Sequence, residues 1–273
     1  MFGGRSATNI GGSAVTTTTL IYHNAARNVR KTHPNAVMAI VMNMVQVLML
    51  VAVFYVMFML LGLRGSAIRG DFFLYLLSGI FMFITHVKSV KAVFSSEGPA
   101  SPMMNHLPMT TAIAISSSAL STLYLQILSI LVILFIYDAI SGPIEIHQPV
   151  YALGMLFLAW FSGCAVGMVF LALKPWAPRF SQTAMMIYQR ANMIASGKMF
   201  VANSLPGFMI VYFDWNPLFH IIDQTRGYTF INYFPHFTSL TYPIIVSLIV
   251  LAIGLMGEFY TRKNASMSWE ARR

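Results

Sequence analysis

The densest group of reactive side chains lies near the C-terminal end, in the stretch WNPLFHIIDQTRGYTFINYFP from Trp215 to Pro235. His220 and Asp223 are one helical turn apart there, a spacing that suits acid–base chemistry. The stretch offers no nucleophile to complete such a site, so catalysis is the weaker interpretation. A helix over residues 217–227 would instead place His220, Asp223 and Gln224 on one face, opposite an apolar face. We expect this polar face to line a wet lumen; the alternative is a helix that only packs against its neighbours.

The charged and aromatic residues around this helix suggest a role in binding. Asp223 and Arg226 are three residues apart, so their side chains can pair. Aromatic residues crowd the same segment, among them Trp215, Tyr228 and Tyr233. The interfacial belt of a membrane protein explains many of them. The sharper hypothesis is that some ring faces stack on sugar rings while His, Asp, Asn and Gln side chains bind the sugar hydroxyls.

Two cations, Arg190 and Lys198, stand in an apolar stretch that precedes this segment. A cation buried within a membrane span is costly, so it usually marks a transport path or a partner. Both side chains could instead anchor the span by reaching towards its ends. We keep both interpretations, contact with an anionic substrate and anchoring.

Motifs of catalysis and of metal binding are absent from the sequence. It contains no HExxH, no P-loop lysine motif, no GxSxG and no CxxC, and no predicted span carries two carboxylates. We therefore expect no catalytic residue, no metal and no cofactor on this chain. A single cysteine, Cys164, excludes a disulfide within the chain. The 20 methionines stand mostly among aliphatic residues, which favours packing over copper binding.

The composition decides the class of protein to which these residues belong. Of 273 residues, 57% are hydrophobic and only 9% are charged, whereas soluble domains carry about 25% charged residues. An all-α integral membrane protein with several spans is the expected fold class. The net charge of +9 then reflects membrane topology, and no nucleic-acid partner is expected.

The chain divides into four predicted segments. Residues 1–19 are rich in Gly, Ser and Thr and are expected to be disordered. Residues 20–34 form a basic amphipathic helix at the membrane interface. Residues 35–262 form a six-span domain, and residues 263–273 a cytoplasmic tail. The six apolar stretches are 36–62, 72–94, 109–137, 150–173, 183–203 and 241–260.

The distribution of Lys and Arg predicts the orientation in the membrane. With the N-terminus in the cytoplasm, most of these cations fall on the inner side, as the positive-inside rule requires. The outer side then holds most of the acids, which are Asp71, Asp138, Glu145, Asp214 and Asp223. Six spans return the C-terminus to the cytoplasm.

Two connections between the spans stand out. The inner one, residues 95–109, is predicted to hold a very short helix that Ser101 caps and Pro102 begins. The outer one, residues 204–241, is apolar and aromatic, yet prolines and a glycine divide it into short pieces. Two short reentrant helices at residues 205–235 would fit this pattern. Non-helical backbone at that depth must pack against protein or line a wet cavity.

The stretch SGKMFVANSLPGFMIVYFDWNPLFHIIDQTRG resembles the permease subunits of ABC-type polysaccharide exporters, which export capsule, O-antigen and teichoic acid in bacteria. The shared pattern consists of Ser196-Gly197, Leu205-Pro206, Asn216-Pro217-Leu218 and Arg226. The order of predicted elements is also similar along most of the chain. Lys198 departs from the pattern, because an apolar residue is expected there, and this change would suit an acidic glycan.

The resemblance implies a half-transporter in the bacterial inner membrane, with both termini cytoplasmic. Its partners would be a second copy of the chain, a dimer of a separate ATPase that binds ATP and Mg²⁺, membrane lipids, a polysaccharide, and periplasmic and outer-membrane export proteins. Residues 205–235 would form the periplasmic gate, and the first and fifth spans would line the channel. The short inner helix near residues 100–108 would couple to the ATPase; its residues are Ser101, Pro102, Met103, Met104, Asn105 and His106.

Three other functions compete with polysaccharide export. An ABC permease of the same fold could export a lipid or a drug. A secondary transporter should show paired inverted repeats with broken helices, and no repeat is evident. A membrane enzyme should show clustered acids or histidines, which the sequence lacks.

Overall fold

The structure is a computed structural model of the chain, and it describes residues 10–32, 36–62, 68, 70–98 and 110–264. Within these ranges the chain forms helices and no strands, which confirms the predicted all-α class. The long helices are α1 (Ile10–Thr32), α2 (Ala36–Leu60), α3 (Phe72–Phe94), α4 (Thr111–Ser141), α5 (Pro149–Leu173), α6 (Pro178–Ala195) and α9 (Thr241–Asn264). The short ones are α7 (Gly207–Ile210) and α8 (Pro217–Thr229).

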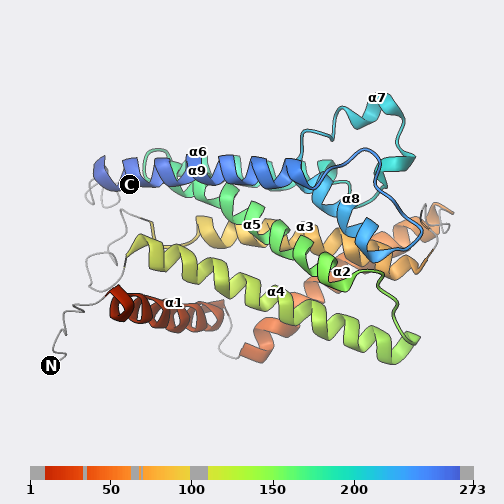
Figure 1. Cartoon of the computed structure of the whole chain (residues 1–273), viewed down its shortest axis with the longest axis horizontal. Helices are drawn as coiled ribbons and strands as arrows, with labels where there is room; N and C mark the ends of the chain where they lie inside the picture. Colours follow the sequence, from red (N-terminus) through yellow and green to blue (C-terminus); the bar gives the residue numbers. More distant parts are fainter. Residues whose placement is uncertain (1–9, 33–35, 63–67, 69, 99–109, 265–273) are drawn as a thin grey trace.

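Most of the long helices run along one axis and form a bundle (Figure 1). The first described residues of α1 and the end of α9 lie at one end of this bundle, and α7 and α8 lie at the opposite end. Asp71 caps the start of α3, Asp138 lies in the last turn of α4 and Glu145 lies in the connection between α4 and α5, whereas Lys174 caps the end of α5 and Arg262 lies in the last turn of α9. This separation agrees with the predicted topology, in which the two ends of the bundle face opposite sides of a membrane.

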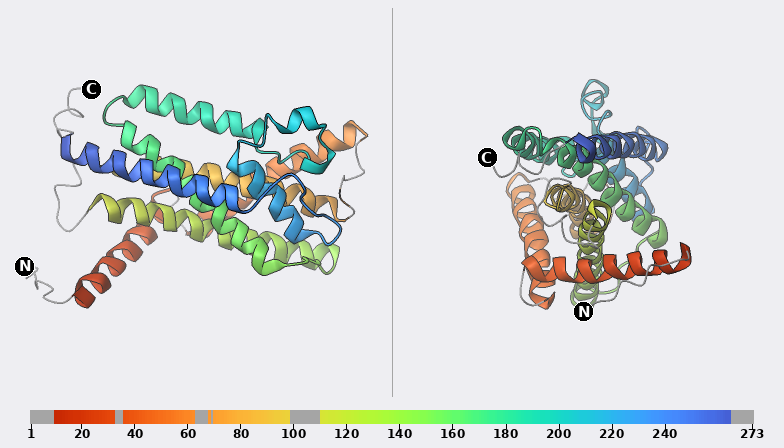
Figure 2. Two further views of the ribbon diagram at one scale, coloured as in Figure 1. Left: turned by 45° about the horizontal axis from the view of Figure 1, so that its top comes forward. Right: turned by 90° about the vertical axis from the view of Figure 1, so that its left-hand side faces the viewer.

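Five of the helices are long and apolar enough to cross a membrane, namely α2, α3, α4, α5 and α9. The predicted fifth span, residues 183–203, is not among them. Its helix, α6, ends at Ala195, and Gln182, Gln189, Arg190 and Asn192 make it amphipathic. It nevertheless lies alongside the other helices of the bundle (Figure 2). The six-span count is therefore not confirmed, because polar residues interrupt the apolar surface of this helix and Gly197 follows its end.

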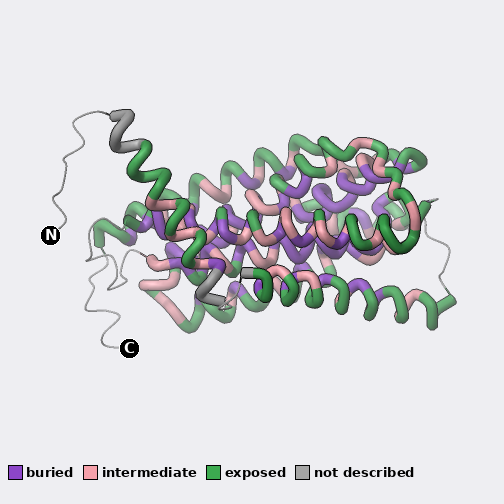
Figure 3. Tube along the Cα trace, turned by 90° about the horizontal axis from the view of Figure 1, so that it is seen from below, coloured by how far each residue is buried: buried purple, intermediate pink, exposed green. Residues whose placement is uncertain are grey.

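The helix α3 forms the centre of the bundle, with buried residues along nearly all of its length. It packs against α2, α4, α5 and α8. Two glycines of α5 allow the closest approach: a Cβ at Gly163 would lie 2.5 Å from the carbonyl oxygen of His86, and one at Gly167 would lie 2.8 Å from that of Val90. In contrast, α2 lies at the edge of the bundle with exposed residues along much of its length (Figure 3).

The N-terminal helix differs from the prediction at its start. Residues 10–19, expected to be disordered, form the first part of α1, which ends at Thr32. No proline or glycine interrupts the chain from Ser13 to Thr32, and the Thr19 hydroxyl donates to the carbonyl of Val15 within the helix. Residues 1–9 lie outside the described part of the chain.

The helix α1 lies across the bundle axis (Figure 2). Polar contacts fix it there, because the amides of Asn24 and Asn28 donate to the hydroxyl of Ser117 on α4 at 2.9 and 3.3 Å. Part of the predicted polar face is thus bound to the bundle, while His23 and Arg27 are exposed.

Candidate functional site

Arg226 holds the segment that follows α6. Its guanidinium donates three hydrogen bonds to backbone carbonyls, those of Gly197 at 3.1 Å, Phe200 at 2.6 Å and Lys198 at 2.7 Å. The same group lies 4.5 Å from the ring centre of Tyr75 on α3, a cation–π contact. Only 1% of Arg226 is exposed. The pair with Asp223 that the spacing allows does not form among the described residues, because the guanidinium points at these carbonyls.

Asp223 binds the two segments on either side of α8. One carboxylate oxygen accepts hydrogen bonds from the hydroxyl of Tyr233 and from the backbone N–H of Ala202, the latter at 3.4 Å. The other accepts from the hydroxyl of Thr238 at 2.8 Å. Burial and the nearby Asp223 carboxylate raise the pKa of Tyr233, so its hydroxyl keeps its proton and stays a donor.

His220 and Gln224 bind the chain that leads into α9. The Nδ1 atom of His220 accepts from the backbone N–H of Ser239 at 3.1 Å, and its Nε2 lies 2.7 Å from the carbonyl oxygen of Asp214. Gln224 donates to the carbonyl of Thr238 at 2.9 Å. Within the chain the polar face of α8 is therefore bonded to residues 233–239. A helix that packs against its neighbours, the alternative expectation, makes contacts of this kind.

The start of α8 is joined to the end of α6. The side chain of Asn216 accepts from the N–H of Leu218, and its amide donates at 2.9 Å to Asn192 and to the carbonyl of Ala195. Pro217 occupies the first turn, where its missing N–H costs nothing. Gly197 has φ +71°, a left-handed conformation that side chains disfavour, and a Cβ there would lie 2.5 Å from the Phe219 ring.

We call this unit the clamp; it comprises residues 196–202, Asn216, Asp223, Arg226 and Tyr233. Three of the four motif elements that carry the family resemblance lie in or directly beside it, namely Ser196-Gly197, Asn216-Pro217-Leu218 and Arg226. Residues that are 29 positions apart in sequence, Gly197 and Arg226, are in direct contact. The motif is therefore a structural unit that joins α6, α8 and α3.

Lys198 lies inside the clamp and is 1% exposed. Its ammonium group donates to the carbonyl of Met193 and lies 4.1 Å from the ring centre of Phe83 and 5.6 Å from that of Phe54. These contacts take the place of a carboxylate partner. They hold the ammonium group of Lys198 inside the clamp, as the anchoring interpretation expects. Arg190, in contrast, is exposed on α6, so the structure does not bring the two cations together.

The predicted aromatic residues fall into two groups. Tyr228 stacks on Tyr151 of α5 with ring centres 5.3 Å apart, and Tyr233 is buried in the clamp. Trp215 is exposed at the tip of the segment, as are Phe208, Tyr212 and Phe234. These exposed rings are the ones available to a sugar or to the membrane interface. The predicted coupling residues, from Ser101 to His106, lie outside the described residues.

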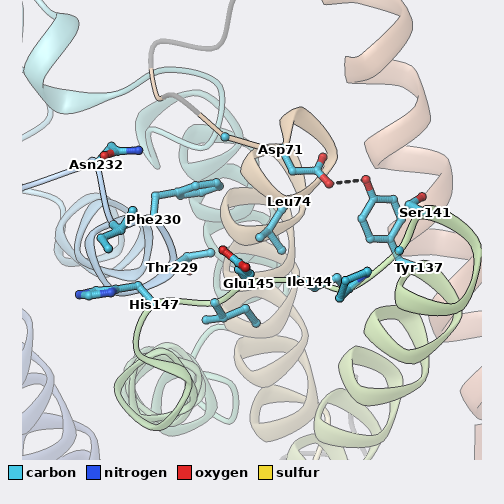
Figure 4. A pocket seen from close by; sticks show the side chains of 15 residues that line it. Asp71, Leu74, Tyr137, Ser141, Ile144, Glu145, His147, Thr229, Phe230 and Asn232 are labelled. Atoms are coloured by element: carbon cyan, nitrogen blue, oxygen red, sulfur yellow. Dashed lines mark hydrogen bonds between the residues drawn. The ribbon is translucent and has the colours of Figure 1, made fainter.

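Sequence reasoning missed a cavity at the end of the bundle that holds α8. It has a volume of about 550 Å³ and lies between the start of α3, the end of α4, the turn before α5 and the end of α8. Asp71, Tyr137, Glu145 and His147 line it, and the Tyr137 hydroxyl donates to Asp71 (Figure 4). The sequence placed Asp71 and Glu145 on the outer side, but their distance in the chain gave no sign that they share a cavity.

Replacing Asp223 with asparagine is expected to loosen residues 230–240 without unfolding the bundle. The substitution keeps the shape but weakens the hydrogen bonds from Tyr233 and Thr238, at a cost of about 1–3 kcal/mol. Hydrogen exchange of the purified chain should show faster exchange in this segment alone. Glu145→Gln serves as the control, because Glu145 is exposed and lies outside the clamp. Equal exchange in both variants would contradict the role given to Asp223.

The bundle and its clamp define a class: an all-helical protein with several apolar helices that are long enough to cross a membrane. No family model matches the chain. Two proteins of Escherichia coli, each named polysialic acid transport protein KpsM, are similar to it. One is 24% identical over 218 residues, 77% of this chain and 82% of the relative. The other is 26% identical over 203 residues, 72% of this chain and 76% of the relative.

These relatives confirm the resemblance first seen in residues 196–226, to the permease subunits of ABC-type polysaccharide exporters. The matches extend over about three quarters of the chain, so the resemblance is not confined to the motif. The protein is a multi-pass membrane protein.

Proposed function

We propose that the chain is the permease half of an ABC transporter that exports a cell-surface polysaccharide across the inner membrane. Two copies would form the channel, and a separate ATPase dimer would bind ATP and Mg²⁺ and drive export of a lipid-linked glycan. The observation that carries this proposal is the clamp. The motif residues shared with polysaccharide exporter permeases contact one another there, and the relatives are named for polysialic acid transport.

The geometry supports a gate at the end of the bundle that holds α8. The helix α8 binds residues 197–202 through Arg226 and residues 233–239 through Asp223, Gln224 and His220. A displacement of α6 would therefore move α8 and the start of α9 together. In this proposal α6 and the clamp complete a sixth crossing, and the exposed rings around Trp215 face the polysaccharide as it leaves. Both termini would lie in the cytoplasm.

The exposed surface of α6 fits a place beside the channel or a second copy. Its exposed residues include Met186, Ile187, Met193 and Ile194 together with Arg190. In the dimer, Arg190 would contact an anionic glycan, while the buried Lys198 would stabilise the clamp. Membrane lipids would cover the remaining apolar surface, and periplasmic and outer-membrane export proteins would accept the product.

Co-purification in mild detergent from the native host tests the class of transporter. We expect a P-loop ATPase to travel with the chain in equal amounts, and a deletion strain to lose a polysaccharide from its envelope. A chain that purifies alone, even after crosslinking, would contradict the proposal and favour a secondary transporter or an enzyme. The polar residues of α8 would then need to be considered as a substrate site.

The segment 101–106 gives a second test, which concerns coupling. Replacing Asn105 and His106 with glutamates is expected to uncouple ATP hydrolysis from export, because bulky charged side chains would prevent a short helix from entering a cleft in the ATPase. Export should fall by at least about tenfold, equivalent to roughly 1.4 kcal/mol of coupling, while membrane insertion is unchanged. Export at the wild-type rate would overturn the assignment of this segment.

A further inference from the structure

A second cavity, separate from the clamp, opens between α4 and α5. It is a groove of about 260 Å³ whose floor is formed by α3 and α8 and whose walls are formed by α4 and α5. The side chains that line its walls and floor are mainly aliphatic and aromatic, among them Leu77, Phe81, Leu131, Leu134, Leu153 and Leu156. Leu131 and Leu153 are 57% and 43% exposed, so the groove is open on the outside of the bundle, where the lipid of a membrane would lie.

The few polar atoms in the groove are already bonded within their own helices. The hydroxyl of Ser78 donates to the carbonyl of Tyr75 at 2.9 Å. Those of Thr225 and Thr229 donate to the carbonyls one turn before them, at 2.7 and 2.8 Å. The groove therefore presents a hydrocarbon surface that offers water no hydrogen-bond donor. A hydrocarbon chain fits this surface, whereas a sugar does not.

The groove continues into the polar cavity at the end of the bundle. The two cavities share Leu74, Ile146 and Thr229 as lining residues. Together they form one amphipathic site, with an apolar part along the helices and a polar mouth at the end that holds α8. This arrangement matches a lipid, whose acyl chain lies along the helices and whose headgroup lies at the membrane surface.

The described residues that line the mouth carry negative charge. Asp71 and Glu145 line it, and none of its described lining residues is Lys or Arg. Asp71 caps α3 through the N–H of Phe73 and accepts from Tyr137, so its carboxylate is held in place. Glu145 is exposed and forms no hydrogen bond or ion pair within the described residues. Two carboxylates, with no Lys or Arg among the described residues beside them, repel a headgroup of net negative charge and attract an ammonium group.

We propose that this site binds a phospholipid with an ammonium headgroup, of the phosphatidylethanolamine type, from the leaflet at the α8 end. One acyl chain occupies the groove between α4 and α5, and the ammonium group lies between Asp71 and Glu145. The lipid fills the space where α4 and α5 diverge and so supports the turn between them. The inference requires only that the chain spans a membrane, and it does not depend on the transported substrate or on the ATPase.

Native mass spectrometry of the purified full-length chain tests the site. The chain is titrated with dioleoyl phosphatidylethanolamine or with dioleoyl phosphatidylglycerol, and the occupancy of the first bound lipid is measured. The double variant Leu131→Trp, Leu153→Trp fills the groove. Leu248→Trp is its matched control, because Leu248 lies on α9, is 52% exposed and does not line the groove. The double variant Asp71→Asn, Glu145→Gln removes both charges and keeps the helix cap, since asparagine caps as well as aspartate.

The wild-type chain is expected to bind phosphatidylethanolamine roughly fivefold more tightly than phosphatidylglycerol, as two partly exposed charge pairs allow. The groove-filling variant should lose this first lipid, and the control should retain it. The charge variant should bind both lipids equally. Unchanged binding in the groove-filling variant would overturn the site. Equal binding of the two lipids by the wild type would overturn the headgroup assignment.

A crosslinking experiment in vesicles keeps the proposal testable if the groove-filling variant does not fold. The wild-type chain is reconstituted into vesicles of phosphatidylethanolamine and phosphatidylglycerol that contain a trace of phosphatidylethanolamine with a photoreactive acyl chain. Peptides of α4 and α5 that carry Leu131, Leu134 or Leu153 should be labelled in excess over those of α9. Labelling spread evenly over α4, α5 and α9 would show ordinary boundary lipid and contradict the proposal.

Discussion

Replacing Arg226 with alanine is expected to destabilise the chain by about 3 kcal/mol or more, because each buried carbonyl left without a hydrogen bond costs about 1–3 kcal/mol. The substitution leaves the carbonyls of Gly197, Lys198 and Phe200 without their donor, in a region closed to water. Arg226→Lys should recover only part of the loss, because a single ammonium group lacks the planar fork that reaches all three oxygens. Thermal unfolding of the chain in mild detergent measures both effects.

Arg190→Ala is the matched control for this prediction. Arg190 is also a cation of the same region, but its side chain is exposed on α6, so its removal should change stability by no more than about 0.5 kcal/mol. Its export activity, in contrast, should fall if it contacts an anionic glycan. If the Arg226→Ala variant unfolds at the same temperature as Arg190→Ala, the clamp does not stabilise this part of the bundle.

Replacing Gly163 with leucine is expected to prevent the packing of α5 on α3. Gly163 and Gly167 form a small-residue pattern with four-residue spacing, which lets two helix backbones approach closely. A Cβ at Gly163 would lie 2.5 Å from the carbonyl oxygen of His86 and 2.8 Å from Cβ of Ser89. Both are parts of a helix and cannot move independently. Overpacking of this kind costs about 1–3 kcal/mol or more, and four side-chain carbons exceed what the site can absorb.

Gly154→Leu provides the control on the same helix. No atom lies within 4 Å of a Cβ at Gly154, so leucine should be tolerated and should gain about 0.5–0.8 kcal/mol in helix propensity. Yield after gel filtration and thermal unfolding would separate the two variants. A Gly163→Leu chain as stable as Gly154→Leu would mean that α3 and α5 are not held at this distance.

Composition and apolar stretches predict most of the bundle. The five helices α2, α3, α4, α5 and α9 lie close to the predicted spans, because a long apolar segment has few alternatives to a helix in lipid. The prediction fails at α6 for a physical reason. Its exposed Met and Ile residues resemble a span, but Asn192 accepts from Asn216 while Gln182 and Arg190 are exposed, and composition alone does not show which side of a helix has a protein partner.

The sequence also predicts the polar face of α8 but not what covers it. The positions of His220, Asp223 and Gln224 show that one face needs hydrogen-bond partners. Water in a lumen and the chain's own residues 233–242 can both supply these hydrogen-bond partners, and only the folded chain distinguishes the two. The pair of Asp223 with Arg226 does not form for a related reason. Their local spacing allows the pair, but three carbonyls at residues 197–200, distant in sequence, accept hydrogen bonds from the guanidinium instead.

The position of α3 at the centre of the bundle has a consequence for synthesis of the protein. It is the least apolar of the five candidate spans and the most buried, and His86 on it bonds to Ser162 of α5 and to Tyr188, which is 102 residues further along the chain. At about 5–20 residues per second, the ribosome takes roughly 5–20 s to make the second partner. During that interval the polar groups of α3 must be held by the insertion machinery or by α2 and α4, so release of this helix into lipid follows the synthesis of helices that come after it.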